Sequence, residues 1–112
     1  MRLALALALL PAVPLLQANL AAPQAQAQAV AQDAALLAFL DRAYDEQLAL
    51  SPESQTQLGL KTNYDRLDDY TDAASLRAEA LAERQLAALH AQFKPADLGE
   101  SARVSYRLFE YE

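Results

Sequence analysis

The chain has 112 residues, no cysteine, and a formal net charge of −6 from 15 acidic and nine basic side chains. This acidic balance argues against nucleic acid and an anionic membrane as partners, because both require clustered Lys and Arg. The length allows one domain at most, and a domain this small without disulfides has to rely on close helix packing or on further protein.

Residues 1–27 have the three-part composition of a secretory signal peptide. Arg2 gives a positive start, residues 3–10 contain only Leu and Ala, and small side chains follow. A membrane span needs about 20 continuous apolar residues, and Pro11 and Pro14 interrupt this run well before that length. The segment therefore predicts an exported protein, periplasmic or secreted, that is not held in the membrane once the leader is removed.

The cleavage site is predicted from the small residues at the end of this leader. Signal peptidase accepts only small side chains at positions −3 and −1, and Ala25 and Ala27 satisfy both. Pro23, a helix breaker, is expected to keep the chain extended here. We predict cleavage after Ala27, followed by a flexible Ala/Gln segment over residues 28–32. Two other alanines are lesser alternatives for the last leader residue: Ala22 and Ala29.

Residues 33–112 predict an all-α segment of about four helices. The first helix is expected from Asp33, a residue suited to capping a helix N-terminus, to Leu50. Apolar side chains at three- and four-residue spacing mark the face that we expect to be buried. These side chains are Leu36, Leu37, Leu40, Ala43, Tyr44 and Leu48, with Phe39 beside them.

The pair Ser51-Pro52 predicts that one helix stops and another starts. Ser51 is a good N-cap, and Pro52 suits the first helical position, where a missing N–H does no harm. A short second helix to Leu58 follows, with Gly59 as its left-handed cap. Residues 60–70 then form a polar connection.

The third and longest helix is expected to begin at Thr71 or Asp72. It ends near Phe93, because Pro95 cannot continue it. Its expected apolar stripe comprises Ala78, Ala82, Leu86, Leu89 and Phe93, with Leu76 and Leu81 beside it.

A fourth helix is expected to start at residues 98–100. Val104, Leu108 and Tyr111 are expected to line one face, with Tyr106 and Phe109 beside them. The aromatic residues Tyr106, Phe109 and Tyr111 are expected to be core or inter-helix contacts. No Gly, Asn or Pro closes this pattern before Glu112. We therefore expect the chain to be the N-terminal part of a longer protein, whose remainder is its packing partner.

Few side chains in the sequence carry chemistry. A zinc site needs three or four ligands, so His90, the single histidine, is expected to serve the helix dipole or the surface. Tyr64, Asp65 and Arg66 are weak candidates for lining a cleft in the complete protein; the alternative for this region is turn formation, helix capping and solvation. No Ser-His-Asp set, calcium loop or cysteine nucleophile is present, so we expect neither catalytic nor metal-ligating residues in this segment.

Five groups of residues follow one another in a recognisable order: Phe39-Leu40-x-x-Ala43-Tyr44, Ser51-Pro52-Glu53, Leu58-Gly59, Tyr64-Asp65-x-x-x-Asp69-Tyr70-Thr71 and Val104-Ser105-Tyr106-x-Leu108-Phe109. Their order and spacing resemble the N-terminal helical portion of the bacterial family known as domain of unknown function 885. The resemblance implies an exported, mostly helical protein with a zinc-metallopeptidase-like site, built further along from a His-Glu motif and a Pro-Gly-His element. Because His90 is followed by Ala91, no functional residue is carried over to this segment.

The sequence leaves two hypotheses of function. In the first, the chain is the N-terminal structural segment of an exported zinc-dependent peptidase, a hydrolase. Zinc and a peptide substrate then belong to the complete protein, and this segment itself has no cofactor. In the second, the chain is a complete small periplasmic helical protein that binds a protein partner through its apolar helix faces.

Overall fold

A computed structural model describes residues 18–112 of the chain. The elements are α1 (Ala18–Leu48), α2 (Pro52–Gln57), α3 (Asp72–Gln92), the 3₁₀ turn η1 (Pro95–Asp97) and α4 (Glu100–Tyr111). No strand occurs in the described range, so the all-α class and the four expected helices are confirmed. The positive start and apolar run expected for the leader fall in residues 1–17, outside the described residues.

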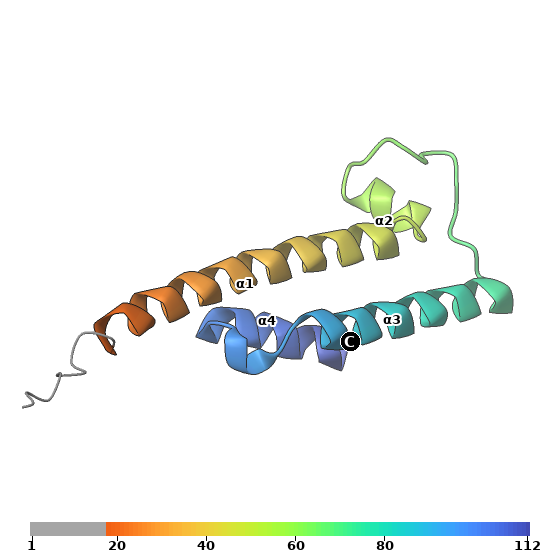
Figure 1. The fold of residues 1–112 in the computed structure, drawn as a ribbon. Coiled ribbons are helices and arrows are strands. Elements are labelled where there is room, and N and C mark those ends of the chain that lie inside the picture. Colours follow the sequence, from red (N-terminus) through yellow and green to blue (C-terminus); the bar gives the residue numbers. More distant parts are fainter. Residues whose placement is uncertain (1–17) are drawn as a thin grey trace, which may run out of the picture.

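The long helix α1 organises the other elements. It contacts α2, α3, η1 and α4. Figure 1 shows α3 returning alongside α1 in the opposite direction, after which η1 reverses the chain and α4 lies beside both. The residues that come together are therefore the middle of α1, the second half of α3 and α4.

Local capping signals fix where the shorter helices begin and end. The Ser54 N–H donates to Ser51 Oγ at 3.2 Å, and Pro52 is the first residue of α2. Gly59 follows α2 with a φ of 80°, in the left-handed region that glycine enters without strain. At the start of α3, Thr71 Oγ1 accepts from the Ala74 N–H at 3.2 Å. The caps expected from the sequence are confirmed at these three ends.

The hydrophobic core joins α1 to the end of α3, to η1 and to α4. Phe39 lies at its centre and meets two other rings edge to face, Phe93 at 5.7 Å and Phe109 at 5.9 Å between centroids. Each such pair contributes about 0.5–1.5 kcal/mol beyond the burial of its area. The buried members of the core are Leu36, Phe39, Ala43, Leu89, Phe93, Leu98, Ala102 and Tyr106.

The first helix differs from the expectation at its start. Residues 28–32, expected to be flexible, are helical, and Pro23 lies inside α1. Asp33 is therefore not the N-cap of its own helix. Its Oδ1 accepts the N–H of Gly99, the residue that caps α4, at 2.8 Å. The carboxylate was suited to capping, as the sequence indicated, but the helix that it caps is distant in sequence.

The buried faces of α1 and α3 agree only in part with the expected stripes. Leu36, Ala43, Leu89 and Phe93 are buried as expected. On α1, Leu37 and Tyr44 are exposed, whereas Phe39 is buried. On α3 the buried residues are Leu81, Gln85 and Leu89, and the alanines of the expected stripe face solvent instead. Alanine contributes little area, so the larger residues on a neighbouring line decide which face packs.

The apolar face expected on α4 is not the one that is buried. Of its aromatic residues, Tyr106 is buried in the core and Phe109 packs against it, as expected, whereas Tyr111 is exposed. Ala102 and Tyr106 are buried, whereas Val104, Leu108 and Tyr111 are 56%, 63% and 95% exposed. Both faces of this helix carry apolar residues, so its periodicity alone did not identify the one that meets the core. The exposed apolar face of α4 consists of Val104, Leu108 and Tyr111.

Gln85 is a buried polar residue that the sequence pattern did not identify. Its Nε2 donates to the Ala43 carbonyl at 3.1 Å and to Glu46 Oε2 at 2.9 Å. Its Oε1 accepts from Gln47 Nε2 at 2.9 Å. The amide is thus fully used, and it joins α3 to α1 at the edge of the core.

Candidate functional site

The cleft candidates of the sequence lie in the connection between α2 and α3. Tyr64, Asp65 and Arg66 occupy one turn, in which the Arg66 N–H donates to the Asn63 carbonyl at 3.0 Å. All three side chains are exposed, Tyr64 by 61%. They are neighbours on the surface of the described residues, and their role in a cleft of a longer protein stays a prediction.

The acidic residues that follow this turn hold α2 in place. Asp68 Oδ1 accepts the Glu53 N–H at 2.9 Å, and its Oδ2 accepts from the Ser51 hydroxyl at 2.7 Å. Tyr70 donates to Glu53 Oε2 at 2.7 Å, and this hydrogen bond raises the pKa of the Tyr70 hydroxyl. These contacts are helix capping and turn formation, the alternative that the sequence left open.

Asp69 serves the start of α3 in the same way. Its Oδ1 accepts from the Thr71 hydroxyl at 2.7 Å and from the Thr71 N–H at 3.1 Å. Its Oδ2 lies 2.9 Å from the Arg77 guanidinium. The hydrogen bond from the Thr71 hydroxyl, followed by that from its N–H, holds the pKa of Asp69 below the ordinary value of 3.8. Asp69 is therefore a structural carboxylate near a helix terminus.

His90 links α3 to α4. It lies in the last turn of α3, where a protonated imidazole favours the helix dipole, and its Nε2 is 2.6 Å from Glu110 Oε1. The Tyr106 ring is 6.2 Å away. Burial raises the pKa of the Tyr106 hydroxyl, and the Glu110 carboxylate raises it further.

No metal site is assembled from these side chains. Within residues 18–112, no group of three or more His, Cys, Asp or Glu is placed to hold one metal ion. The residues present therefore do not fit a zinc centre, and no zinc-dependent step is derived from them. A separate finding concerns membranes: none of the helices in the same range combines the length and the apolar character that a span requires.

The residues expected at the signal cleavage site lie in the first turns of α1. Ala25 and Ala27 are exposed, as are all residues from 21 to 28. This stretch contributes nothing to the core, which begins at Leu36.

The surface carries an unusual amount of apolar material. Among the described residues, thirteen large apolar side chains are exposed, against nine hydrophobic residues that are buried. Scattered apolar residues are normal on a protein surface, but ordered rows of them mark places where further protein packs. The exposed set is Val30, Leu37, Tyr44, Leu50, Leu58, Leu60, Tyr64, Leu67, Tyr70, Leu76, Val104, Leu108 and Tyr111.

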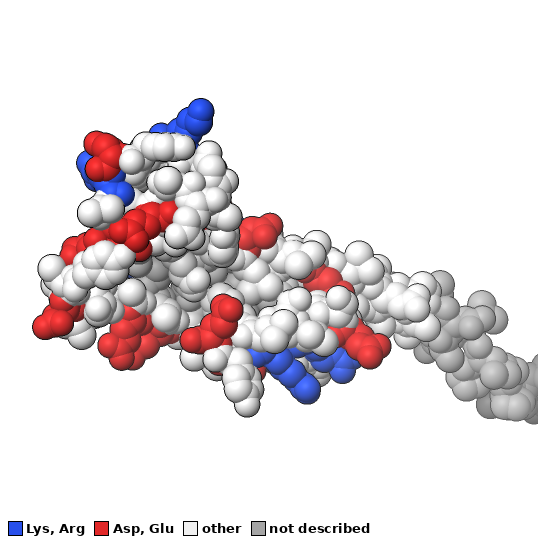
Figure 2. Space-filling view, turned by 180° about the vertical axis from the view of Figure 1, so that it is seen from behind, with Lys and Arg blue, Asp and Glu red and all other residues white. Residues whose placement is uncertain are grey.

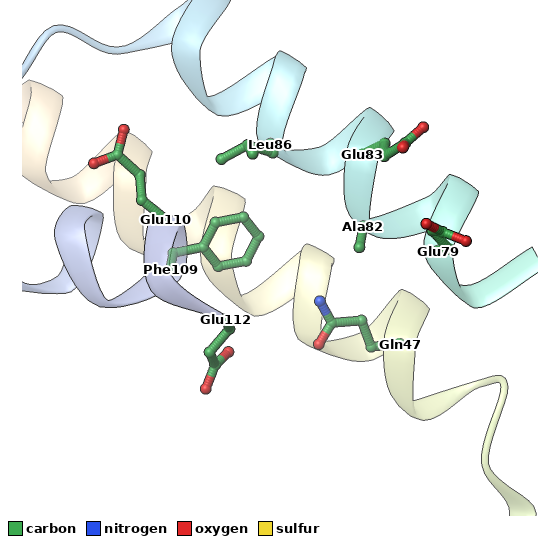
Figure 3. A pocket seen from close by; sticks show the side chains of 8 residues that line it. All are labelled: Gln47, Glu79, Ala82, Glu83, Leu86, Phe109, Glu110 and Glu112. Carbon is green, nitrogen blue, oxygen red and sulfur yellow. The ribbon is translucent and has the colours of Figure 1, made fainter. Parts of the chain in front are cut away.

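An open groove of about 350 Å³ lies between α1, α3 and α4. Figure 3 shows the apolar side chains of Ala82, Leu86 and Phe109 together with the glutamates around them. The groove is also lined by Gln47 and by four acidic residues: Glu79, Glu83, Glu110 and Glu112. This groove was not predicted from the sequence, although the spacing of Glu79 and Glu83 places both on one face of α3.

Acidic side chains dominate the described surface. On the face drawn in Figure 2, Asp and Glu are spread over most of the molecule, whereas Lys and Arg are confined to a few places. On α4, Arg103 and Arg107 line one hollow together with Glu100 and Val104. The groove is lined by Phe109, Glu110 and Glu112 at the end of α4, whereas the two arginines stand earlier in this helix.

One comparison with known proteins gives a match. The family model described as "Bacterial protein of unknown function (DUF885)" matches residues 52–112, more than half of the chain. The matched range contains α2, α3 and α4, and therefore most of the helices that pack on α1. No curated protein and no solved structure matches the chain.

Proposed function

Because this chain belongs to the DUF885 family of bacterial proteins, we propose that it serves as the structural helical segment of a longer exported protein. In this function its described helices form a small core of their own. Their outer apolar faces then pack against the remainder of the same polypeptide.

The observation that carries this proposal is the exposed apolar face of α4. Val104, Leu108 and Tyr111 follow one another at helical spacing, and each is more than half exposed. The opposite side of the helix is buried in the core through Ala102 and Tyr106. A helix that is apolar on two sides is stabilised by burial on both, at about 25 cal/mol per Å² of apolar area. Further protein against α4 supplies the second contact.

The chemistry implied by the family resemblance belongs, in this proposal, to the remainder of the polypeptide. His90 is the single histidine of the sequence, is followed by Ala91, and contacts Glu110. We therefore propose zinc binding and peptide hydrolysis for the longer protein, with the present segment supporting that site without contributing a ligand or a catalytic group.

Export is the other part of the proposal, with cleavage after Ala27. The residues around this bond are exposed and pack against no other element, so unwinding them would leave the core unaffected. Pro23 weakens the helix at this point, because a proline inside a helix costs about 3 kcal/mol. Both features favour an extended chain in the peptidase.

The test compares residues 28–112 alone with the longest polypeptide encoded in the same reading frame. We expect the segment alone to bind a hydrophobic dye and to unfold at lower urea concentration, because its apolar faces are uncovered. Metal analysis of the longer polypeptide tests for zinc. A stop codon directly after Glu112, with cooperative unfolding and no dye binding, would contradict the proposal and support a small periplasmic partner-binding protein instead.

A further inference from the structure

The groove between α1, α3 and α4 combines an apolar floor with negative charge. Ala82 and Leu86 of α3 and Phe109 of α4 form the floor, and Phe109 also packs against the core through Phe39. Figure 3 shows the glutamates projecting from α3 and from the end of α4 around this floor. The groove therefore offers a place for apolar side chains with carboxylates beside it.

The two glutamates that α3 contributes to the groove, Glu79 and Glu83, have no basic partner in the described part of the chain. Between residues 18 and 112, no Lys or Arg lies within 4.0 Å of Glu79 or Glu83. The two are four residues apart on α3, a spacing at which like charges are neighbours and repel each other. Glu110 differs, because it contacts His90. Added positive charge would thus be stabilising beside Glu79 and Glu83 in particular.

We propose that the groove receives a cationic amphipathic helix from the remainder of the same polypeptide. Its apolar side chains lie on Leu86 and Phe109, and its flanking Lys or Arg side chains pair with Glu79 and Glu83. An amphipathic helix laid in an apolar groove is a common mode of recognition, and complementary charges at the edges fix its register. The inference rests on the proposed function and adds the chemistry of the segment that packs here.

A second copy of the chain is the main competitor for the groove. The α4 helix itself presents Arg103 and Arg107 beside the exposed Val104, with Glu100 next to them, so its outer side combines apolar residues with a small excess of positive charge. Docking this side in the groove of another copy would be a head-to-tail contact, which generates rings or open filaments instead of a two-fold dimer. The packing of α4 against the same polypeptide avoids that outcome.

The experiment places a photo-crosslinking amino acid at Ala82 in the full-length protein. Ala82 is exposed and lies on the groove floor. After irradiation, mass spectrometry of the digested protein identifies the crosslinked segment. We expect a segment of the same chain in which apolar residues at helical spacing alternate with Lys or Arg. Ala73, an exposed alanine in the first turn of α3 that is not among the groove residues, is the control position and should not crosslink to that segment.

A charge reversal tests the electrostatic part. Replacing both Glu79→Lys and Glu83→Lys should lower the crosslinking yield at position 82 severalfold, because like charges then oppose docking. Asp41→Lys, on the exposed side of α1, is the control and should leave the yield unchanged. Both altered glutamates are exposed, and circular dichroism verifies that the helices are retained.

Each other outcome overturns the inference in a distinguishable way. A crosslink within the chain to a neutral or acidic segment overturns the charge complementarity and leaves the proposed function intact. A crosslink between two molecules assigns the groove to a second copy if the mass is doubled, and to another protein if the added mass differs. A yield no higher than at Ala73 shows an open groove, and a stop codon after Glu112 removes the inference together with the proposed function.

Discussion

The two regions that pack on α1 are held by different forces. Around Leu36 and Phe39, α1 meets α3 and α4 through buried apolar side chains and aromatic rings packed edge to face. Near Leu48, it meets α2 through hydrogen bonds, and the one buried residue of α2 is Gln55. The Gln55 Nε2 donates to the Leu48 carbonyl at 2.8 Å, and its Oε1 accepts from Asn63 Nδ2 at 2.8 Å.

The two regions therefore contribute differently to the stability of the fold. Apolar burial contributes most of the favourable free energy of folding, so the Phe39 region should determine whether the segment folds at all. Hydrogen bonds contribute little net free energy while they are satisfied, but each broken one leaves a polar group unpaired. The α2 region should therefore open first and separately, as weakly packed parts of proteins do.

The largest expected effect comes from Phe39→Ala, which removes the ring shared by Phe93 and Phe109. We expect the free energy of unfolding to fall by about 3–5 kcal/mol, the usual cost of emptying such a site. Urea denaturation followed by circular dichroism measures it. Leu37→Ala, on the exposed side of the same helix, should change it by no more than about 0.5 kcal/mol. Equal losses in the two variants would show that the core lies elsewhere.

A smaller and local effect is expected from Gln55→Leu. The substitution leaves the Leu48 carbonyl and the Asn63 amide without their partner, at a cost of about 1–3 kcal/mol. Hydrogen exchange should then be faster in α2, with protection in the second half of α3 retained. Gln57→Leu changes an exposed residue of the same helix and serves as the control. Loss of protection in both regions together would mean that they unfold as one unit.

The smallest effect concerns pH and Asp69. Because its pKa is lower in the folded chain than the ordinary 3.8, ionised Asp69 stabilises the fold above that value. This contribution is lost as the pH falls below 3.8 and through the folded pKa. Thr71→Ala removes the hydroxyl that is the main cause, so its Asp69 pKa should rise toward 3.8 in an NMR titration of the carboxyl carbon. An unchanged titration would refute the assigned cause.

Helix ends were predictable from the sequence because their causes are local. The Ser51 side chain accepts a backbone N–H of the first turn, Pro52 has no N–H to leave unpaired, and Gly59 adopts a positive φ without strain. Each of these effects acts within a few residues, so the neighbouring sequence is sufficient to identify it. Thr71 at the start of α3 follows the same logic. The all-α class and the number of helices depend on these signals, and both were predicted correctly.

Helix faces were less predictable because distant residues choose them. On α4, two apolar lines compete, and contact with Phe39 and its neighbours selects the one that contains Tyr106. The polar bridge through Gln85 and the groove beside Glu79 exist only once α1 and α3 are side by side. Periodicity within one helix holds no information on either.

The bond between Asp33 and Gly99 has a consequence for the order of folding. The two residues are 66 positions apart, so the contact that caps α4 requires the closure of a long loop. The core partners of α1 likewise come from Leu89 onward. During synthesis, α1 is made before any of these partners, and contacts between residues so far apart in the sequence form slowly. The core of the described segment is therefore incomplete until Tyr106 has been made, and this delay favours the unfolded state that the proposed export uses.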